Sequence, residues 1–290
     1  MTERSGDRMI ITIDGGTTNT RISLVSDKTI RDRIKTRVGA RDSLDGTPLR
    51  ETVRDGIKEL LARNRLSEND ITAVALSGMI GSESGLKDIP HILAPAGKEE
   101  LRQAAVRADM PEITGIPMYF IPGVRTFGTD AFTQNMSAAE ICRSATDCDI
   151  MRGEETELVG ITEAIPSVIV ENTTVILPGS HMKLIRTDSA GRITGFRTSI
   201  AGELIRAIAE NTILSHSIGN IFPGKADEEW LREGFDFAGR NGLGDALFKI
   251  RVMANFAGTS PEKLYAFLTG AVLREDVIAA AESERVVIGG

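Results

Sequence analysis

The sequence predicts an α/β protein of two similar domains that face each other across a central cleft. Its length of 290 residues is typical of about two domains. A hairpin of apolar strands around a glycine-rich turn opens the chain, and a second hairpin of the same kind begins at residue 173. Each hairpin is followed by a third strand and then by an amphipathic helical stretch. We therefore place the first domain at residues 1–170 and the second at 171–290.

The first group of strands is read from its hydrophobic pattern. The run 9–14 is apolar up to Asp14, whereas apolar and polar residues alternate over 20–25, and both patterns indicate strands. Because the link between them is short and led by glycines, the pair forms a hairpin. A third strand is expected over 29–37 and a helix over 48–66. The apolar face of that helix consists of Leu49, Val53, Ile57, Leu60 and Leu61.

The second group repeats this order. A strand reaches Leu177, the turn Gly179-Ser180 follows, and further strands are expected over 182–186 and 193–198. A helical stretch over 201–214 then carries its apolar residues on one face. Those residues are Leu204, Ile205, Ile208 and Ile213.

The turn of the first hairpin has the residues of a phosphate-binding site. Gly15 and Gly16 lack the side chains that would keep phosphate oxygens away from backbone N–H groups, and Thr17 and Thr18 add hydroxyl groups. Asp14, at the end of the strand, is suited to hold Mg²⁺ through water. No helix follows the glycines, which excludes a P-loop or Rossmann turn. An ordinary hairpin with a polar turn is the alternative interpretation.

Composition limits the classes of partner. The net charge of −7 argues against a nucleic-acid-binding or membrane surface. Cys142 and Cys148 are too few for a disulfide framework or a zinc site, which fits a reducing, cytoplasmic compartment. The sequence has neither an 18-residue apolar stretch nor the apolar core of a signal peptide. We expect no nucleic-acid partner and no membrane partner.

The segment MRGEETELVG, residues 151–160, is typical of a helix start. Gly153 interrupts the preceding segment, and Glu154 and Glu155 fall in the first turn, where the helix dipole favours anions. These glutamates are either functional carboxylates or charges that only complement the dipole on an exposed face. The preceding segment, 125–149, is expected to be a helix-bearing insertion.

Several motifs resemble those of a known superfamily. The duplicated hairpins are similar to those of sugar kinases, Hsp70 and actin, whose two ribonuclease-H-like domains clamp ATP. Within this superfamily the chain resembles the 2-dehydro-3-deoxygalactonokinases. The matching segments are DGGTTNTR (14–21), LSGMIGS (76–82), PHILAPAG (90–97), IPGVR (121–125), DIMRGEETELVG (149–160), LPGSHMK (177–183) and GFRTSIAGEL (195–204).

This resemblance implies a reaction and a set of residues. The reaction is the ATP-dependent phosphorylation of the 6-hydroxyl group of 2-dehydro-3-deoxy-D-galactonate in galactonate breakdown, with Mg²⁺ held by Asp14. Glu154 matches the position at which related sugar kinases have their catalytic base, an aspartate after a glycine, and Glu155 and Asp149 are the alternatives. The residues implied to bind ATP are Gly15, Gly16, Thr17, Thr18, Gly179, Ser180, Gly289 and Gly290.

The same resemblance gives the basic residues a role. A sugar acid carries a carboxylate, and arginine pairs with a carboxylate through two parallel hydrogen bonds. Arg152 is close in sequence to the expected base, so we favour it for this contact. The full set of expected substrate-binding residues is Arg21, Gly78, Ser82, Arg125, Arg152, Lys183 and Arg197.

Two other functions remain open at this point. The chain could be another small-molecule kinase or phosphatase of the superfamily, or a non-catalytic protein that binds a sugar acid. A homodimer is compatible with the sequence. The chain ends at Gly290, where the superfamily continues with a helix, a strand and a final helix, so we expect a second domain that is truncated at its end.

Overall fold

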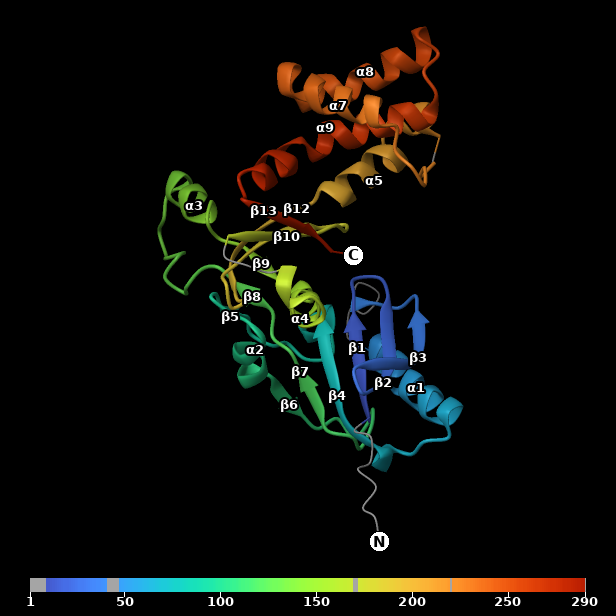
Figure 1. Cartoon of the computed structure of the whole chain (residues 1–290), viewed down its shortest axis with the longest axis vertical. Coiled ribbons are helices and arrows are strands. Elements are labelled where there is room, and N and C mark those ends of the chain that lie inside the picture. Colours follow the sequence, from blue (N-terminus) through green and yellow to red (C-terminus); the bar gives the residue numbers. More distant parts are fainter. Residues whose placement is uncertain (1–8, 41–46, 169–171, 220, 290) are drawn as a thin grey trace. The chain divides into compact units, whose positions relative to one another are not determined.

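The computed structural model describes residues 9–40, 47–168, 172–219 and 221–289 (Figure 1). The chain divides into two compact units. Unit 1 comprises residues 1–167 and 190–195, and unit 2 comprises residues 168–189 and 196–290. Among the described residues, no helix combines the length and the apolar character needed to cross a membrane.

The main sheet of unit 1 has the strand order β3-β2-β1-β4-β7-β6. The hairpin β1–β2 and the pair β2–β3 are antiparallel, whereas β1 pairs with β4, and β4 with β7, in parallel. The predicted first hairpin and third strand are thereby confirmed. The strands are β1 (Met9–Gly15), β2 (Thr20–Ser26), β3 (Thr29–Thr36), β4 (Ile71–Gly78), β6 (Val106–Ala108) and β7 (Met118–Phe120).

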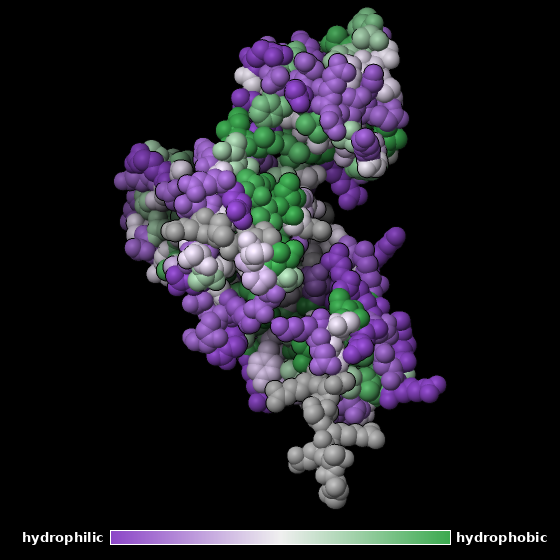
Figure 2. All heavy atoms as spheres, viewed as in Figure 1, coloured by the Kyte–Doolittle hydropathy of each residue, from purple (hydrophilic) through white to green (hydrophobic). Residues whose placement is uncertain are grey.

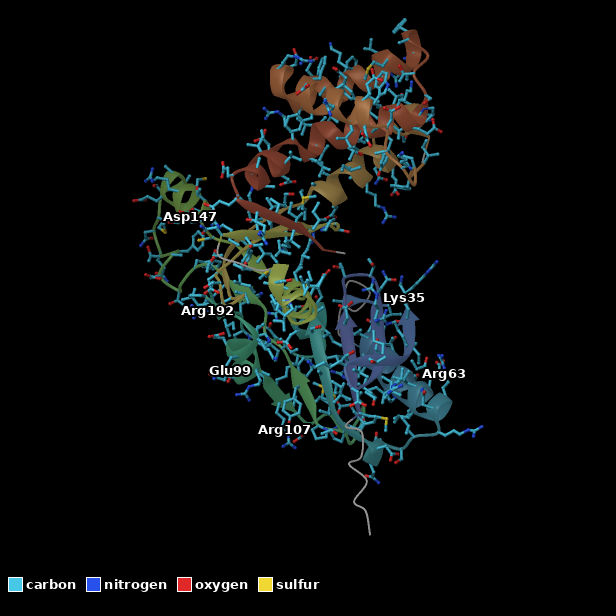
Figure 3. The ribbon with its side chains drawn as sticks, in the orientation of Figure 1. Lys35, Arg63, Glu99, Arg107, Asp147 and Arg192 are labelled. Carbon is cyan, nitrogen blue, oxygen red and sulfur yellow. The ribbon has the colours of Figure 1, made fainter. Side chains whose placement is uncertain are left out.

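Helix α1 (Thr47–Asn64) packs its apolar face on this sheet, as predicted (Figure 1). Its end is tied to β3, because Arg63 and Asn64 both donate hydrogen bonds of 2.8 Å to the carboxylate of Asp32. Figure 3 labels Arg63 at this end of the helix. The five predicted face residues are all buried in the core of unit 1, together with strand residues such as Ile11, Ile13, Ile22 and Leu76.

A second, small sheet of unit 1 has the order β5-β8-β9. Its strands are β5 (Ile92–Leu93), β8 (Val124–Arg125) and β9 (Ile150–Met151). The helix expected within 125–149 is α3 (Ala138–Ala145), which begins with a capping box between Ser137 and Glu140. The remaining elements of this unit are α2 (Lys98–Ala104), α4 (Glu154–Ala164) and the short 3₁₀ helices η2 (Glu68–Asp70), η3 (Met79–Gly81) and η4 (Pro166–Val168).

Unit 2 repeats the strand order of unit 1. Its sheet has the order β12-β11-β10-β13, in which β10 and β11 form an antiparallel hairpin and β13 pairs with β10 in parallel. This is the same order as β3-β2-β1-β4, so the predicted duplication of the strand groups is confirmed. The strands are β10 (Thr173–Leu177), β11 (Met182–Thr187), β12 (Ile193–Ser199) and β13 (Arg285–Ile288).

The connection from β12 to β13 is a helical layer with its own core (Figure 1). The prediction for the helix over 201–214 is wrong at Ile213. That residue is 59% exposed because α5 ends at Asn211, and Leu214 takes the buried position instead. Figure 2 shows hydrophilic residues over much of the surface in view, in keeping with the net charge. The helices are α5 (Ala201–Asn211), α6 (Ser215–Ile218), α7 (Glu228–Asn241), α8 (Leu243–Phe256) and α9 (Pro261–Ala281).

The packing of α1 yields a stability prediction. Leu60 is fully buried against the sheet, so Leu60→Ala is expected to lower the free energy of unfolding by about 2–5 kcal/mol. Lys58→Ala, at an exposed position of the same helix, should change it by less than about 0.5 kcal/mol. Urea unfolding followed by far-ultraviolet circular dichroism measures both, and equal effects of the two variants would contradict this packing.

Candidate functional site

The first hairpin places Asp14 opposite Arg21. The two residues face each other in the register of β1 and β2, and Arg21 Nη1 donates a hydrogen bond of 2.7 Å to Asp14 Oδ2. Each side chain is about half exposed, at 49% and 46%. In the turn itself the Gly16 N–H donates to the Asn19 carbonyl at 2.8 Å, and Thr17 is exposed at the tip. Thr18 is also exposed, and its hydroxyl accepts from the Asn19 amide.

Three glycine backbones meet behind this hairpin. A Cβ atom on Gly78, at the end of β4, would lie 2.6 Å from the Gly15 carbonyl oxygen and 3.5 Å from Asp14 Oδ1. A Cβ atom on Gly153, before α4, would lie 3.2 Å from Gly78 Cα. Both residues have positive φ angles, 81° and 117°, which L side chains rarely adopt. The missing side chains therefore bring the start of α4 next to Asp14.

The two glutamates at the start of α4 have different environments. Glu154 is partly exposed and accepts a hydrogen bond of 3.2 Å from the Arg152 N–H. Glu155 is 0% exposed, and both of its carboxylate oxygens lie 2.8 Å from the Gly153 N–H. Burial raises the pKa of Glu155 to about 8, although the Gly153 hydrogen bond opposes this. At neutral pH Glu155 is therefore mostly protonated and hidden, whereas Glu154 is accessible.

Sequence reasoning missed a further carboxylate on α4. Glu157 lies three residues after Glu154, a spacing that places two side chains on the same face of a helix. Desolvation and the charges of Glu154 and Asp14 raise the pKa of Glu157, which is exposed, while Arg21 lowers it. Asp14, Arg21, Glu154 and Glu157 thus form one charged group in unit 1. The i,i+3 spacing was the signal available in the sequence.

Asp149 and Ser82 make local contacts. The Asp149 carboxylate accepts a hydrogen bond of 2.7 Å from the Ile150 N–H, and its backbone pairs with Thr126 at the entrance to β9. The Ser82 hydroxyl donates to the Met79 carbonyl at 2.6 Å and closes η3. These contacts neither assign nor remove a functional role, so both residues remain predictions.

The small sheet gathers the basic residues of unit 1. We use the name basic cluster for His91, Arg125 and Arg152. In the register of the sheet, Leu93 faces Arg125 and Arg125 faces Ile150. Arg152 follows β9, and its Nη2 donates to the Ile89 carbonyl at 2.5 Å and lies 3.3 Å from His91 Nδ1.

Two guanidinium nitrogens in this cluster lack hydrogen-bond acceptors. Arg125 Nε and Arg152 Nη1 are buried and have no partner among the described residues. Burial and the positive charges of Arg152 and Arg125 lower the pKa of His91 to about 4, so the imidazole is neutral at pH 7. Sequence reasoning predicted the two arginines and missed His91.

The second hairpin lies in unit 2 with the other predicted residues. Gly179 and Ser180 form its exposed turn, and the Glu203 N–H of α5 donates to the Ser180 carbonyl at 3.0 Å. Lys183 is 4% exposed and donates to Thr198 Oγ1 at 2.8 Å, whereas Arg197 is exposed on β12. The Gly289 N–H donates to Ile176 of β10 at 2.9 Å, and Gly290 lies outside the described residues.

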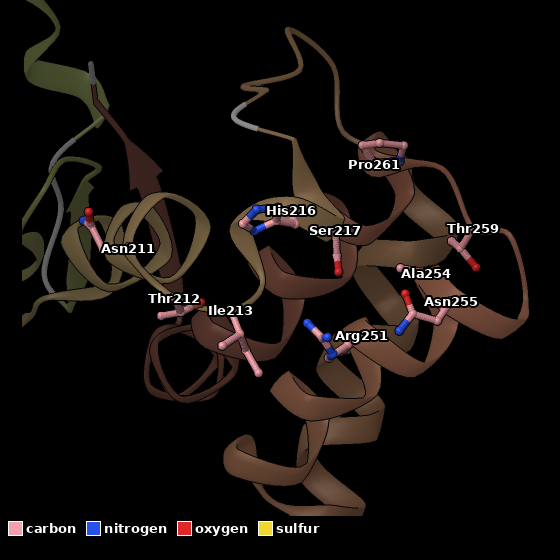
Figure 4. Close-up of a pocket in the computed structure, with 10 residues that line it drawn as sticks. All are labelled: Asn211, Thr212, Ile213, His216, Ser217, Arg251, Ala254, Asn255, Thr259 and Pro261. Atoms are coloured by element: carbon pink, nitrogen blue, oxygen red, sulfur yellow. The ribbon is translucent and has the colours of Figure 1, made fainter.

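A hollow of about 1200 Å³ in unit 2 contains none of the predicted residues (Figure 4). It lies among the end of α5, α6, α8 and the start of α9, and Figure 4 shows Arg251 and Asn255 on its α8 side. Among the described residues, no group of three or more histidines, cysteines, aspartates or glutamates is arranged to hold a metal ion.

The repeated strand order and the hairpin at the head of each sheet define the class of protein. In each unit an antiparallel hairpin is flanked by a third strand on one side and a parallel strand on the other, which is the ribonuclease-H-like α/β arrangement that the sequence predicts. A family model described as 2-keto-3-deoxy-galactonokinase matches residues 14–290, and the chain belongs to that family. The predicted family resemblance is thereby confirmed.

Individual relatives agree with this assignment. The chain is 29% identical over 213 residues to the 2-dehydro-3-deoxygalactonokinase of Escherichia coli (strain K12), covering 71% of this chain and 60% of the relative. It is 26% identical over 218 residues to the "Probable 2-dehydro-3-deoxygalactonokinase DgoK1" of Rhizobium meliloti (strain 1021), covering 74% and 64%. The chain thus matches less than two thirds of the length of either relative.

A solved structure shares the fold. It is described as a "putative 2-dehydro-3-deoxygalactonokinase protein" from Sinorhizobium meliloti. The TM-score is 0.76 at 23% identity, and the match covers 97% of this chain and 84% of that one.

The burial of Glu155 predicts a pH dependence of stability. Because its folded pKa of about 8 lies above the ordinary value of 4.5, protonation favours the folded state. This stabilisation is complete below pH 4.5 and is lost as the pH rises through 8. Glu155→Gln keeps a neutral acceptor for Gly153, so its melting temperature should fall less than that of the wild type between pH 5 and pH 8, by several degrees. Glu51→Gln, at an exposed position of α1, is the control, and parallel pH profiles of wild type and Glu155→Gln would contradict the assignment.

Proposed function

We propose that the chain transfers the γ-phosphoryl group of ATP to the 6-hydroxyl group of 2-dehydro-3-deoxy-D-galactonate. The family match over residues 14–290 carries this proposal. The geometry of unit 1 supports it, because an accessible carboxylate, Glu154, lies beside a phosphate-type hairpin that carries Asp14 near the end of its first strand. A kinase needs such a pair. One carboxylate accepts the proton of the attacking hydroxyl group, and another group helps to neutralise the negative charge of the phosphate.

Glu154 is the proposed general base. In the reaction, the substrate 6-hydroxyl oxygen forms a bond to the γ-phosphorus while the bond from that phosphorus to the β–γ bridging oxygen breaks, and ADP leaves. The hydroxyl proton passes to the Glu154 carboxylate. Glu155 is unsuited to this role because it is buried and mostly protonated at pH 7. The accessibility of Glu154 therefore favours it over the two alternatives, Glu155 and Asp149.

Asp14 is suited to hold Mg²⁺. Mg²⁺ usually keeps several waters and takes one or two protein carboxylates plus phosphate oxygens, so a half-exposed aspartate next to a glycine turn fits. When bound, the ion would neutralise phosphate charge. The charges of Glu154 and Asp14 both act on the Glu157 carboxylate, so the three carboxylates lie near one another. Arg21 now occupies Asp14 Oδ2 and would have to share or release it.

Each hairpin turn, taken by itself, offers exposed residues as candidates for contact with ATP. Thr17 and Thr18 are exposed at the tip of the first turn, and Gly179 and Ser180 at the tip of the second. The Gly16 N–H is engaged within its own turn, which gives Gly16 the role of shaping the turn. Gly289 follows the strand that pairs with β10, so it is a candidate for contact with the nucleoside.

A panel assay tests the function as a whole. ADP release is measured with 2-dehydro-3-deoxygalactonate, its gluconate epimer and a set of aldonates. Release that is specific for the galactonate compound supports the proposal, whereas release with another sugar or alcohol favours a different kinase of the superfamily. Saturable binding without release with any compound would indicate a non-catalytic sugar-acid-binding protein.

Replacement of the base should affect kcat rather than KM. Glu154→Gln keeps the shape of the side chain and removes its basicity, so kcat should fall by roughly 10²–10⁴-fold with little change in KM. Glu157→Gln, three residues further along α4, is the matched control and should retain most of the activity. If Glu157→Gln loses as much as Glu154→Gln, the base has been assigned to the wrong carboxylate.

Replacement of the metal carboxylate should affect Mg²⁺ dependence. Asp14→Asn removes the charge that we propose to hold the ion, so Mg²⁺-dependent ATP binding, measured by calorimetry, should weaken strongly and turnover should be lost. Asp109→Asn, an exposed residue of the same unit that pairs with Arg107, is the control. An unchanged Mg²⁺ dependence of ATP binding in Asp14→Asn would remove Asp14 from the metal site.

A further inference from the structure

We infer that the basic cluster of His91, Arg125 and Arg152 is the subsite that binds the 2-oxo carboxylate end of the substrate. This inference deepens the proposed function and rests on it for the identity of the sugar acid. It also selects two arginines from the five basic residues in or beside the motifs, and it adds His91, which lies in the segment PHILAPAG but is not among the site residues expected from the sequence.

The first argument is the unsatisfied hydrogen-bonding capacity of the cluster. Arg125 Nε and Arg152 Nη1 are buried N–H groups that lack acceptors among the described residues. A buried donor that no acceptor satisfies is destabilising, more so when it belongs to a charged group. A carboxylate supplies acceptor oxygens with the planar geometry that guanidinium groups match. Binding of an acid would therefore satisfy the groups that the folded chain leaves open.

The second argument is the close approach of the His91 ring to Gly123. This residue lies next to β8, and its carbonyl accepts a hydrogen bond of 2.9 Å from the Ile92 N–H of β5. A Cβ atom at Gly123 would lie 2.6 Å from His91 Cδ2 and 2.9 Å from His91 Nε2. The glycine thus allows the imidazole of His91 to lie across the small sheet. Any larger residue would displace the ring from the cluster.

The third argument is the tautomer of His91, that is, which ring nitrogen carries the proton. The guanidinium group of Arg152 can only donate, so the His91 Nδ1 atom, 3.3 Å from Arg152 Nη2, must accept. Because the imidazole is neutral, its proton is then on Nε2. This leaves the cluster with donors from all three side chains. Such a set suits a carboxylate and the neighbouring 2-oxo oxygen, which are all acceptors.

The other candidates for the carboxylate are less suited. Arg21 already pairs with Asp14 at 2.7 Å, and Lys183 is buried with a hydrogen bond to Thr198. Asp88 and Glu155 are the carboxylates whose charges act on Arg152, and neither accepts a hydrogen bond from its guanidinium group. The cluster therefore keeps its positive charge available.

The position of Arg152 links the subsite to the proposed base. Its backbone N–H donates to the Glu154 carboxylate at 3.2 Å, while its guanidinium group reaches Ile89 and His91. A Cβ atom on Gly81 would lie 3.2 Å from Arg152 Nη1, so the η3 turn borders the same guanidinium group. One residue thus connects the place where a carboxylate would bind to the place where a hydroxyl group would lose its proton.

Binding without ATP tests the inference separately from catalysis. The probes are 2-dehydro-3-deoxygalactonate, its 1-amide and the corresponding 2-hydroxy acid, and the dissociation constants are measured by calorimetry. Arg152→Gln and Arg125→Gln should each weaken binding of the acid by roughly tenfold to a hundredfold and leave binding of the amide nearly unchanged. His91→Phe should weaken binding of the 2-oxo acid more than that of the 2-hydroxy acid. Arg107→Gln, an exposed arginine of unit 1, should change none of these values.

Several outcomes would overturn the inference. Equal losses of affinity for the acid and the amide in Arg152→Gln would show that Arg152 has a structural role. A loss of affinity in Arg107→Gln as large as that in Arg152→Gln would lead to the same conclusion. If circular dichroism shows that Arg152→Gln is unfolded, Arg152→Lys keeps the charge without the two-pronged geometry and should still lose affinity for the acid alone. If the galactonate acid does not bind to the wild type, pyruvate is the second probe. Arg152-dependent binding of pyruvate would then uphold the subsite while the proposed function fails, and no binding of either acid would reject both.

Discussion

Close contact between glycine backbones is the constraint on which the candidate site depends. The main chain at Gly15, Gly78 and Gly153 approaches so closely that a Cβ atom on Gly78 would overlap the Gly15 carbonyl. Because β1 and β4 are parallel neighbours, their carboxyl ends meet at one edge of the sheet, and the start of α4 rests against that edge. The acidic residues of the hairpin and of α4 are thereby brought together although they are far apart in the sequence.

The two units share a strand order but differ in the connection between the third and the fourth strand. In unit 1 the chain passes from β3 to β4 mainly through one long helix, α1, which covers the core of the sheet. In unit 2 the corresponding connection from β12 to β13 contains α5 to α9, and these helices have a core of their own. The hairpin is the shared part, whereas the connection that follows it differs between the units.

The sequence predicts the elements better than it predicts the environments of single side chains. The hairpins, α1 and the start of α4 follow from hydrophobic period, glycine position and helix-dipole arguments. In contrast, Glu154 and Glu155 look equivalent in sequence, and only the packing of the first turn shows that one is accessible and the other is fully buried. Ile213 was misplaced because α5 ends at Asn211, so the helical period no longer sets which side chains are buried beyond that residue.

The basic cluster was only partly predictable for a related reason. Strands β5, β8 and β9 are two residues long, so they are too short to show a period in the sequence. Their pairing is what brings His91 to Arg152 across Gly123. Chemical type could therefore single out the arginines, but the histidine needed the register of the sheet.

The neutral state of His91 has a consequence for how the cluster responds to acidity. Arginine stays charged throughout the physiological range, and the pKa of His91 is held at about 4. The net charge of these three side chains is therefore constant between about pH 5 and pH 7, where an ordinary histidine would titrate. Between these two pH values the protein's own ionisation therefore adds no pH dependence to the electrostatic attraction between the cluster and an anion.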